Sequence, residues 1–154
     1  MKILTYTTWS RELKVLYLSE YKSVKACNAL LKPGWFSMIL IVSGTIDFIL
    51  GSSTVRLSAG QLYAVPSLAK AGTIISPIRF YLVSCTIAFA INNRITRYGT
   101  GYLGVITTQS CFALSLSKVE MKHMMQLAEL LKKKIFYKLI NLEMSSGIIY
   151  CLKN

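Results

Sequence analysis

A dense series of short apolar segments between residues 36 and 87, broken by glycine, serine and proline, most constrains how this chain can fold. Phe36–Ser43 is an apolar run that ends at Gly44, and Thr45–Leu50 alternates between two faces. Further strands are expected at Thr54–Leu57, Gln61–Val65, Ile74–Ile75 and Arg79–Ile87. Strands this short, with turn residues at close intervals, are typical of a β-sandwich or a small β-barrel.

The pattern changes near Ser115, where helical spacing replaces alternation. Ser117 and Glu120 have the spacing of a capping box, in which each side chain accepts a hydrogen bond from the other's backbone N–H. Leu116 and Met121 occupy the positions of a hydrophobic staple. Apolar residues then recur every three or four positions: Met124, Leu127, Leu131, Ile135 and Leu139. We therefore predict an amphipathic helix over about residues 118–139.

The first 34 residues give a mixed pattern, in which Tyr, Thr and Lys alternate with Leu and Val before the turn signal Pro33-Gly34. Short edge strands or a packed N-terminal arm fit this stretch best. A separate domain is not expected here, because 154 residues leave little room for two domains.

The chain is rich in apolar residues (53%) and poor in charged residues (16%), whereas an average chain has about a quarter of its residues charged. This composition excludes a disordered chain. The net charge of +12 is only a weak sign of an anionic partner, because the bases are spread evenly along the sequence. We expect the one dense run, Lys132-Lys133-Lys134, at a solvated helix end, where lysines complement the helix dipole. A phosphate or DNA contact is the alternative for this run.

No segment reads as a membrane helix, which needs roughly 18 or more consecutive apolar residues. The most apolar windows, Trp35–Leu50 and Phe80–Ile91, are rich in β-branched residues and favour buried strands. The N-terminus shows no signal-peptide pattern, so we expect a cytoplasmic protein without a membrane partner. The cysteines are then expected to be reduced thiols that pack as small apolar side chains: Cys27, Cys85, Cys111 and Cys151.

The residue types that most catalytic sites need are scarce. The one histidine, His123, excludes a metal site built from several histidines of one chain, and we expect it on the helix surface. There is no G-x-S-x-G nucleophile motif and no Walker or dinucleotide-binding loop, and the 6 acids are scattered. The glycines around Gly99-Thr100-Gly101 have the wrong spacing for a phosphate loop. We therefore expect no enzyme activity, no metal and no cofactor.

The order and spacing of the strand segments resemble the first half of the cupin barrel in the N-terminal sensor domain of AraC-type transcriptional regulators. In that family, an apolar strand ending in Ser-Gly precedes an alternating strand, a turn and a Leu-x-x-Gly-Asp-Leu-x-x-x-Pro segment. Here Ser43-Gly44 ends the apolar strand, and Leu57 to Pro66 follows with Gln61 in place of the usual Asp. Ile78–Ile95 is similar to the family's next strands and following loop. The helix from Ser117 is similar to its dimerisation helix, so the resemblance covers roughly residues 25–150.

This resemblance implies a mainly β fold with C-terminal α structure, namely a cupin-like (double-stranded β-helix) barrel followed by an amphipathic helix. We expect residues 1–115 to form the effector-binding barrel with an N-terminal arm, and residues 116–154 to form a helical dimerisation segment. The histidines and glutamate of metal-binding cupins are missing from the corresponding strands. Nothing in the sequence corresponds to the family's two helix-turn-helix motifs. The chain is therefore expected to end before a DNA-binding domain and to reach DNA only through that domain.

The resemblance predicts that a small-molecule effector binds in the barrel and that the helix pairs two chains as a homodimer. Candidate effector-binding residues are aromatic and polar side chains near the barrel mouth: Trp35, Phe48, Tyr63, Arg79 and Tyr81. The candidate dimer interface is the apolar stripe of the helix: Met124, Leu127, Leu131 and Ile135. The alternative for each group is structural, because strand aromatics usually form core and the stripe could pack onto its own barrel.

Three other functions stay open on the sequence. A metal-free cupin-type enzyme acting on a small metabolite would need an acid–base pair, in which Asp47 is the residue to test. A membrane-surface protein would use the basic and apolar composition. A dimerising scaffold without a ligand would need the helix alone.

Overall fold

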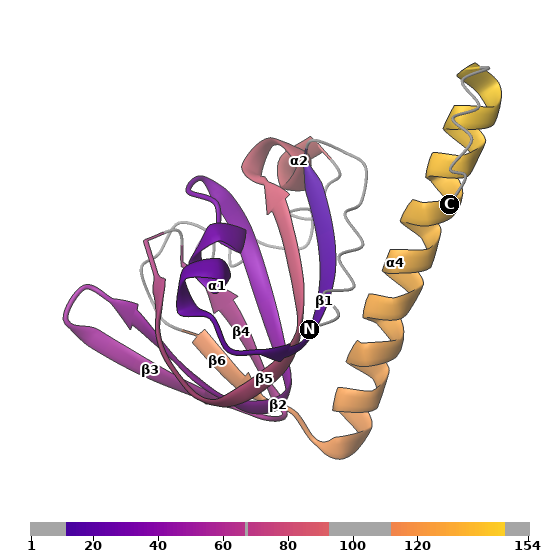
Figure 1. Ribbon diagram of the computed structural model, residues 1–154. Helices are drawn as coiled ribbons and strands as arrows, with labels where there is room; N and C mark the ends of the chain where they lie inside the picture. The colour runs from indigo at the N-terminus through magenta and orange to yellow at the C-terminus, as the bar shows by residue number, and fades with distance from the viewer. Residues whose placement is uncertain (1–11, 67, 93–111, 147–154) are drawn as a thin grey trace.

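The computed structural model in Figure 1 describes residues 12–66, 68–92 and 112–146, which form one antiparallel β-sheet and a long C-terminal helix. The mainly β fold with C-terminal α structure is therefore confirmed. The strands and helices, in chain order, are β1 (Leu13–Tyr21), α1 (Val24–Leu30), β2 (Trp35–Leu50), β3 (Ser53–Ser58), β4 (Gln61–Val65), β5 (Lys70–Thr86), α2 (Ile87–Asn92), β6 (Phe112–Ser115) and α4 (Lys118–Ser146).

The sheet is organised around β2 and β5, which pair with each other from Trp35↔Thr86 to Ile49↔Lys70. The strand order is β1-β5-β2-β4-β6, and β3 also pairs with β2. β4 lies along the first half of β2, while β3 forms a hairpin with its second half. Figure 1 shows the long strands bending around α1, while α4 runs along the other side of the molecule.

Two pairs of expected strands are single long strands in the structure. Phe36–Ser43 and Thr45–Leu50 join as β2, because Gly44 (φ 86°) lets the backbone bend without leaving the sheet. The register between β2 and β5 shifts on both sides of Gly44, and the backbone of Pro77 and Ile78 fills the space where a Cβ would lie. The segments Ile74–Ile75 and Arg79–Ile87 likewise belong to one strand, β5.

Three short elements were not predicted. Helix α1 begins after Ser23, whose side chain accepts a hydrogen bond from the N–H of Ala26. Asn28 fixes this helix to β5 by exchanging two hydrogen bonds with the backbone of Ala71, at 3.1 and 2.7 Å. Helix α2 starts at Ile87, so the expectation of a strand up to Ile87 followed by a loop is wrong for Ile87–Asn92. Strand β6 pairs with β4 and forms the edge of the sheet opposite to β1.

The first 34 residues combine an edge strand with a packed helix. β1 pairs with β5 from Leu13↔Cys85 to Tyr21↔Ile78, as expected for an edge strand. The edge-strand interpretation is therefore confirmed for the described part of this stretch, whereas helix α1 was not expected there. Residues 1–11 lie outside the described residues.

Side chains alternate between the two faces of the sheet, which we call the inner face and the outer face. The inner face lies under α1 and forms the main core, where Tyr63, Phe48 and Phe80 are the largest fully buried side chains. Its buried members come from five strands, from α1 and, at Ala69, from the turn before β5: Leu16, Leu18, Cys27, Ile39, Ile41, Ile46, Phe48, Leu57, Tyr63, Val65, Ala69, Ala71, Ile78, Phe80 and Leu82.

Helix α4 begins as the sequence predicts. The Glu120 side chain accepts from the Ser117 N–H at 2.7 Å, and the Ser117 hydroxyl accepts from the Glu120 N–H at 3.3 Å. Leu116 and Met121 pack in the same apolar cluster, as a hydrophobic staple requires.

The far end of α4 differs from the prediction. The helix continues to Ser146 instead of ending near residue 139, because no residue before Gly147 breaks it. The run Lys132-Lys133-Lys134 therefore lies within the helix and not at its end, so the helix-dipole explanation for these lysines is wrong.

Candidate functional site

The aromatic residues predicted to bind an effector lie on different faces of the sheet. Phe48 and Tyr63 are on the inner face, fully buried, with ring centroids 5.4 Å apart. Tyr81 is on the outer face, beneath α4. The structure thus brings Phe48 and Tyr63 together but not Tyr81. Neighbouring residues of a strand point to opposite faces, and Phe80, next to Tyr81 in β5, points to the inner face.

The remaining two candidates lie at other places. Trp35 begins β2 and is half-buried, and the ammonium groups of Lys14 and Lys32 lie 5.1 and 5.4 Å from its ring centroid. Burial and the neighbouring Lys32 lower the pKa of Lys14 below its usual value. Arg79 is exposed on β5. The five candidates therefore do not converge on one cavity among the described residues.

The inner face is filled by its own side chains. The space between Cys27, Phe48, Phe80 and the neighbouring isoleucines leaves about 0 Å³ for a water-sized molecule. An effector could enter there only if core side chains moved apart, at the cost of their packing. Binding of a small molecule inside the barrel stays a prediction.

The outer face meets α4 in a second apolar cluster, which we call the seam. The sheet contributes a cross-strand row in which Tyr17 and Leu40 both pair with Tyr81. The helix covers this row mainly with methionines, and Ala128 is the one buried residue among the side chains of α4 that the structure describes, Lys118 to Lys133. The members of the seam are Tyr17, Leu40, Val42, Leu62, Tyr81, Leu116, Met121, Met124, Met125 and Ala128.

A polar cluster joins the sheet and the helix beside the seam. The Tyr81 hydroxyl donates to Glu129 at 2.7 Å, and the Lys132 ammonium donates to the same carboxylate oxygen at 2.8 Å. The Lys132 ammonium also lies 5.7 Å from the ring centroid of Tyr17, which is stacked at a tilt on Tyr81 with centroids 4.6 Å apart. These contacts fix the rotation of α4 on the outer face.

The environment of this cluster shifts two pKa values. Burial, together with the Glu129 carboxylate, raises the pKa of the Tyr81 phenol above its usual value, so the hydroxyl stays a hydrogen-bond donor. Burial alone would raise the pKa of Glu129, but the hydrogen bonds from Lys132 and Tyr81 outweigh it and lower this pKa. Glu129 is therefore ionised at neutral pH.

A groove runs along the same junction. It has a volume of about 720 Å³ and lies between Tyr81 and one flank of α4. Its lining combines apolar side chains with several lysines: Tyr81, Lys118, Met121, Lys122, Met125, Gln126, Glu129, Leu130 and Lys133. Small-molecule sites in proteins usually have volumes of about 300–1,000 Å³, so the groove has the size of a ligand site.

The predicted dimer stripe is divided between two faces of α4. Met124 packs in the seam, whereas Leu127 and Leu131 are 53% and 41% exposed. Leu130 is 57% exposed and lies beside them, so the three leucines form an exposed apolar patch on α4, and Leu130 also lines the groove. We call Leu127, Leu130 and Leu131 the leucine patch. The side chain of Ile135 lies outside the described residues.

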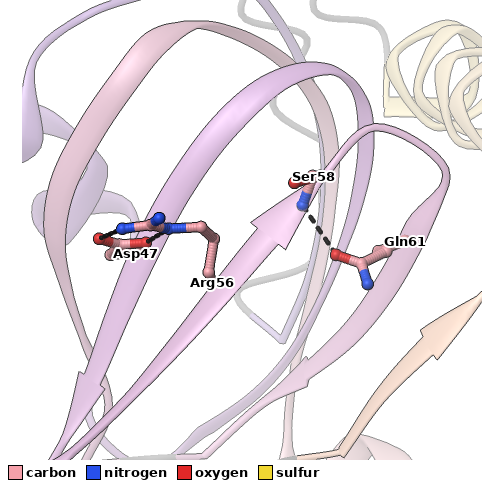
Figure 2. A network of polar contacts seen from close by, with 4 residues as sticks. All are labelled: Asp47, Arg56, Ser58 and Gln61. Atoms are coloured by element: carbon pink, nitrogen blue, oxygen red, sulfur yellow. Dashed lines mark hydrogen bonds and ion pairs between the residues drawn. The ribbon is translucent and has the colours of Figure 1, made fainter.

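Asp47 and Gln61 have structural partners on the β2–β3–β4 hairpins (Figure 2). Arg56 lies directly opposite Asp47 and donates two hydrogen bonds to its carboxylate, at 2.8 and 3.1 Å. The bonds from Arg56 lower the pKa of Asp47, which makes it a weak general base. Gln61 accepts from the Ser58 N–H at 2.7 Å and so closes the turn between β3 and β4, the place where the resembling family has Asp.

The described cysteines and His123 do not form a common site. Cys27 and Cys85 are buried free thiols, and burial raises the pKa of Cys27 to about 12, so it stays protonated. Cys111 and Cys151 lie outside the described residues, as do the glycines near Gly99. His123 is exposed on α4. Within residues 12–66, 68–92 and 112–146, no group of three or more His, Cys, Asp or Glu could hold a metal ion.

None of the helices in the described ranges has the length and apolar character that crossing a membrane requires.

Three solved structures are similar to parts of this chain. The Clostridium difficile EutQ protein is 19% identical over 53% of this chain and 56% of its own, with a TM-score of 0.35. The putative glyoxylate induced protein from Pseudomonas aeruginosa is 13% identical over 70% of this chain and 36% of its own, with a TM-score of 0.42. ToxT from Vibrio cholerae is 10% identical over 93% of this chain and 60% of its own, with a TM-score of 0.44.

This chain therefore spans less than two thirds of the length of each of these proteins. No protein-family model and no curated protein matches its sequence.

Proposed function

We propose that this chain is the cupin-like effector-binding and dimerisation module of an AraC-type transcription regulator, without a helix-turn-helix of its own. The proposal rests on the order of motifs from Ser43-Gly44 to Pro66 and on the helix that follows the sheet. In this function a small molecule biases the position of α4, and α4 pairs with its copy in a second chain. DNA is reached only through a domain outside this sequence.

The observation that carries the proposal is the two-sided apolar character of α4. One side packs on the sheet through Met121, Met124 and Met125, and the other exposes the leucine patch. A helix that served only its own domain would need apolar residues on one side. The second side is what a helix that also contacts another chain requires.

Size-exclusion chromatography with light scattering tests the dimer. We expect a dimer for the full chain and a monomer for the triple variant Leu127→Gln/Leu130→Gln/Leu131→Gln. The matched control is Leu68→Gln/Ile75→Gln, which removes apolar side chains that are 65% and 52% exposed on the sheet side. A full chain that stays monomeric at high concentration, or a control that dissociates equally, contradicts the role of the leucine patch.

The effector part of the proposal is tested by a thermal-shift screen of sugars, organic acids and other metabolites. A ligand that binds only the folded state raises the melting temperature, and the rise grows with the logarithm of the ligand concentration over Kd. If no compound class changes the melting temperature, the module is a dimerising scaffold instead of a sensor.

A further inference from the structure

The groove between the sheet and α4 has an apolar floor. This floor consists of Tyr81 from β5 and of Met121, Met125 and Leu130 from α4. The methionines are half-buried, and Leu130 is 57% exposed, so these side chains keep apolar surface open to a ligand. Methionine is flexible and polarisable and adapts to ligands of different shape. An apolar molecular body fits this floor.

The rim of the groove is cationic. Lys118, Lys122 and Lys133 are exposed along one flank of α4 and all line the groove. The one acidic lining residue, Glu129, already accepts hydrogen bonds from Tyr81 and Lys132. The charge that remains at the rim is therefore positive, and it complements an anion.

We infer that this groove binds a small organic anion whose apolar body lies on the methionine floor and whose charged group faces the lysine rim. The space between Cys27, Phe48 and Phe80 on the inner face has about 0 Å³ open, against about 720 Å³ in the groove.

The inference deepens the proposed function, since it moves the effector from inside the barrel to the helix–sheet junction. Its link to regulation rests on that function, whereas binding itself does not. A ligand in the groove contacts both β5 and α4, so it would favour one position of the helix over others. Binding in the groove therefore provides a direct route from effector to dimer helix.

A pair of dyes tests the inference by isothermal titration calorimetry on the full chain. Anilinonaphthalene sulfonate is an apolar anion, and phenylnaphthylamine is the same aromatic body without the sulfonate. We expect the sulfonate to bind more tightly and its affinity to fall with added salt, because salt screens exposed charges. The variant Lys122→Gln/Lys133→Gln should lose on the order of fivefold in sulfonate affinity and leave the neutral dye unchanged.

Two matched controls locate the binding. Lys22→Gln/Lys25→Gln removes the same charge from exposed positions near α1 and should leave sulfonate affinity unchanged. Gln126→Trp fills the groove and should remove most of the binding, whereas His123→Trp adds the same ring at an exposed position of α4 outside the lining and should not. Circular dichroism confirms that each variant folds.

Equal affinities for the two dyes, or equal losses in the groove and control variants, would overturn the inference. The oligomeric state is measured on the same samples. If the groove variants lose sulfonate affinity but the chain is a monomer, the inference holds and the proposed dimer is contradicted. A dimer that binds neither dye contradicts the inference alone.

Discussion

The two faces of the sheet are built from alternate residues of the same strands, yet they are covered in different ways. On the inner face, Phe48, Tyr63 and Phe80 are almost completely excluded from solvent. On the outer face, α4 covers the sheet with half-buried methionines and leaves a groove of about 720 Å³. One face is a closed core, and the other is a contact that is only partly buried.

The difference follows from what lies on each face. The inner face is enclosed by the bend of β2 and β5 and by α1, which Asn28 attaches to β5. Among the described residues, the outer face is covered by α4, whose attachment depends on the seam and on the polar cluster around Glu129. Elements with few buried apolar contacts open at lower free energy than a core. We therefore expect substitutions to be costly on the inner face and milder at the seam.

The largest effect is expected from Phe48→Ala on the inner face. This residue is fully buried against Tyr63, so its removal leaves a cavity and should lower the free energy of unfolding by about 3–5 kcal/mol. Urea denaturation followed by circular dichroism measures this. Ile75→Ala, at a position 52% exposed, is the control and should change stability by less than about 0.5 kcal/mol. Similar losses in both variants would mean that the inner face is not the main core.

The second-largest loss of stability is expected at Gly44, where β2 bends around the inner face. Gly44→Ala would force an alanine to φ 86° and push its Cβ against the backbone of Pro77 and Ile78, with the Ile78 Cα at 2.9 Å. We expect a loss of about 2–4 kcal/mol from backbone strain and overpacking together.

Gly51→Ala is the control for the bend. Gly51 has φ 59°, but no atom lies within 4 Å of an added Cβ, so only the strain of about 1 kcal/mol should remain. The melting temperatures of the two variants give the comparison. Equal losses would show that the close approach of β2 and β5 at Gly44 does not matter.

At the seam we expect a smaller effect from Met121→Ala. Met121 is half-buried between α4 and the sheet, so about 1–2 kcal/mol should be lost, less than for a fully buried methionine. Val119→Ala, on the same helix and 63% exposed, should be close to neutral. Chemical denaturation of both variants measures the difference. A loss at Met121 as large as that at Phe48 would mean that the outer face is as firmly packed as the inner one.

The smallest effect is expected at the polar cluster, and it depends on pH. The folded state lowers the pKa of Glu129 from 4.5, so its stabilising effect is present above that pH and is lost as the pH falls through the folded value. Its side chain is 40% exposed, so the effect should stay below about 1 kcal/mol.

Glu129→Gln tests this directly. The melting temperature of the variant should lie below that of the original chain at about pH 7, and the two should converge toward about pH 3. A difference that is the same at both pH values would mean that the charge of Glu129 does not hold α4 on the sheet.

Much of the fold could be predicted from local patterns. Gln61–Val65 is a strand with the expected bounds, and the Ser117–Glu120 capping box marks the start of α4. Helix α1 was missed because its seven residues carry too short a periodicity, although Ser23 is an ordinary N-cap. The predicted end of α4 near residue 139 is too early, because the apolar repeat was followed only to Leu139 whereas the helix continues to Ser146.

The candidate site could be predicted only in part. The sequence identified Tyr81 and Met124 as residues of interest, but not that both belong to the seam. Glu129 was missed, because neither its residue type nor its spacing reveals a partner 48 residues away in β5. Lys132 was noted only as part of the lysine run, not as the partner of Glu129. The groove lining comes from β5 and α4, so no local pattern could reveal it.

What the sequence determined by itself is the content of the fold: strands divided by turns, then one amphipathic helix. These follow from hydrophobic periodicity and from capping and turn residues, which act over a few positions. The tertiary structure alone decided which face of the sheet is core and which is a contact. The tertiary structure placed Phe48 and Tyr63 in the core and Tyr81 in the contact with α4. Alternation along a strand decides which face a side chain points to, whereas long-range packing decides what covers that face.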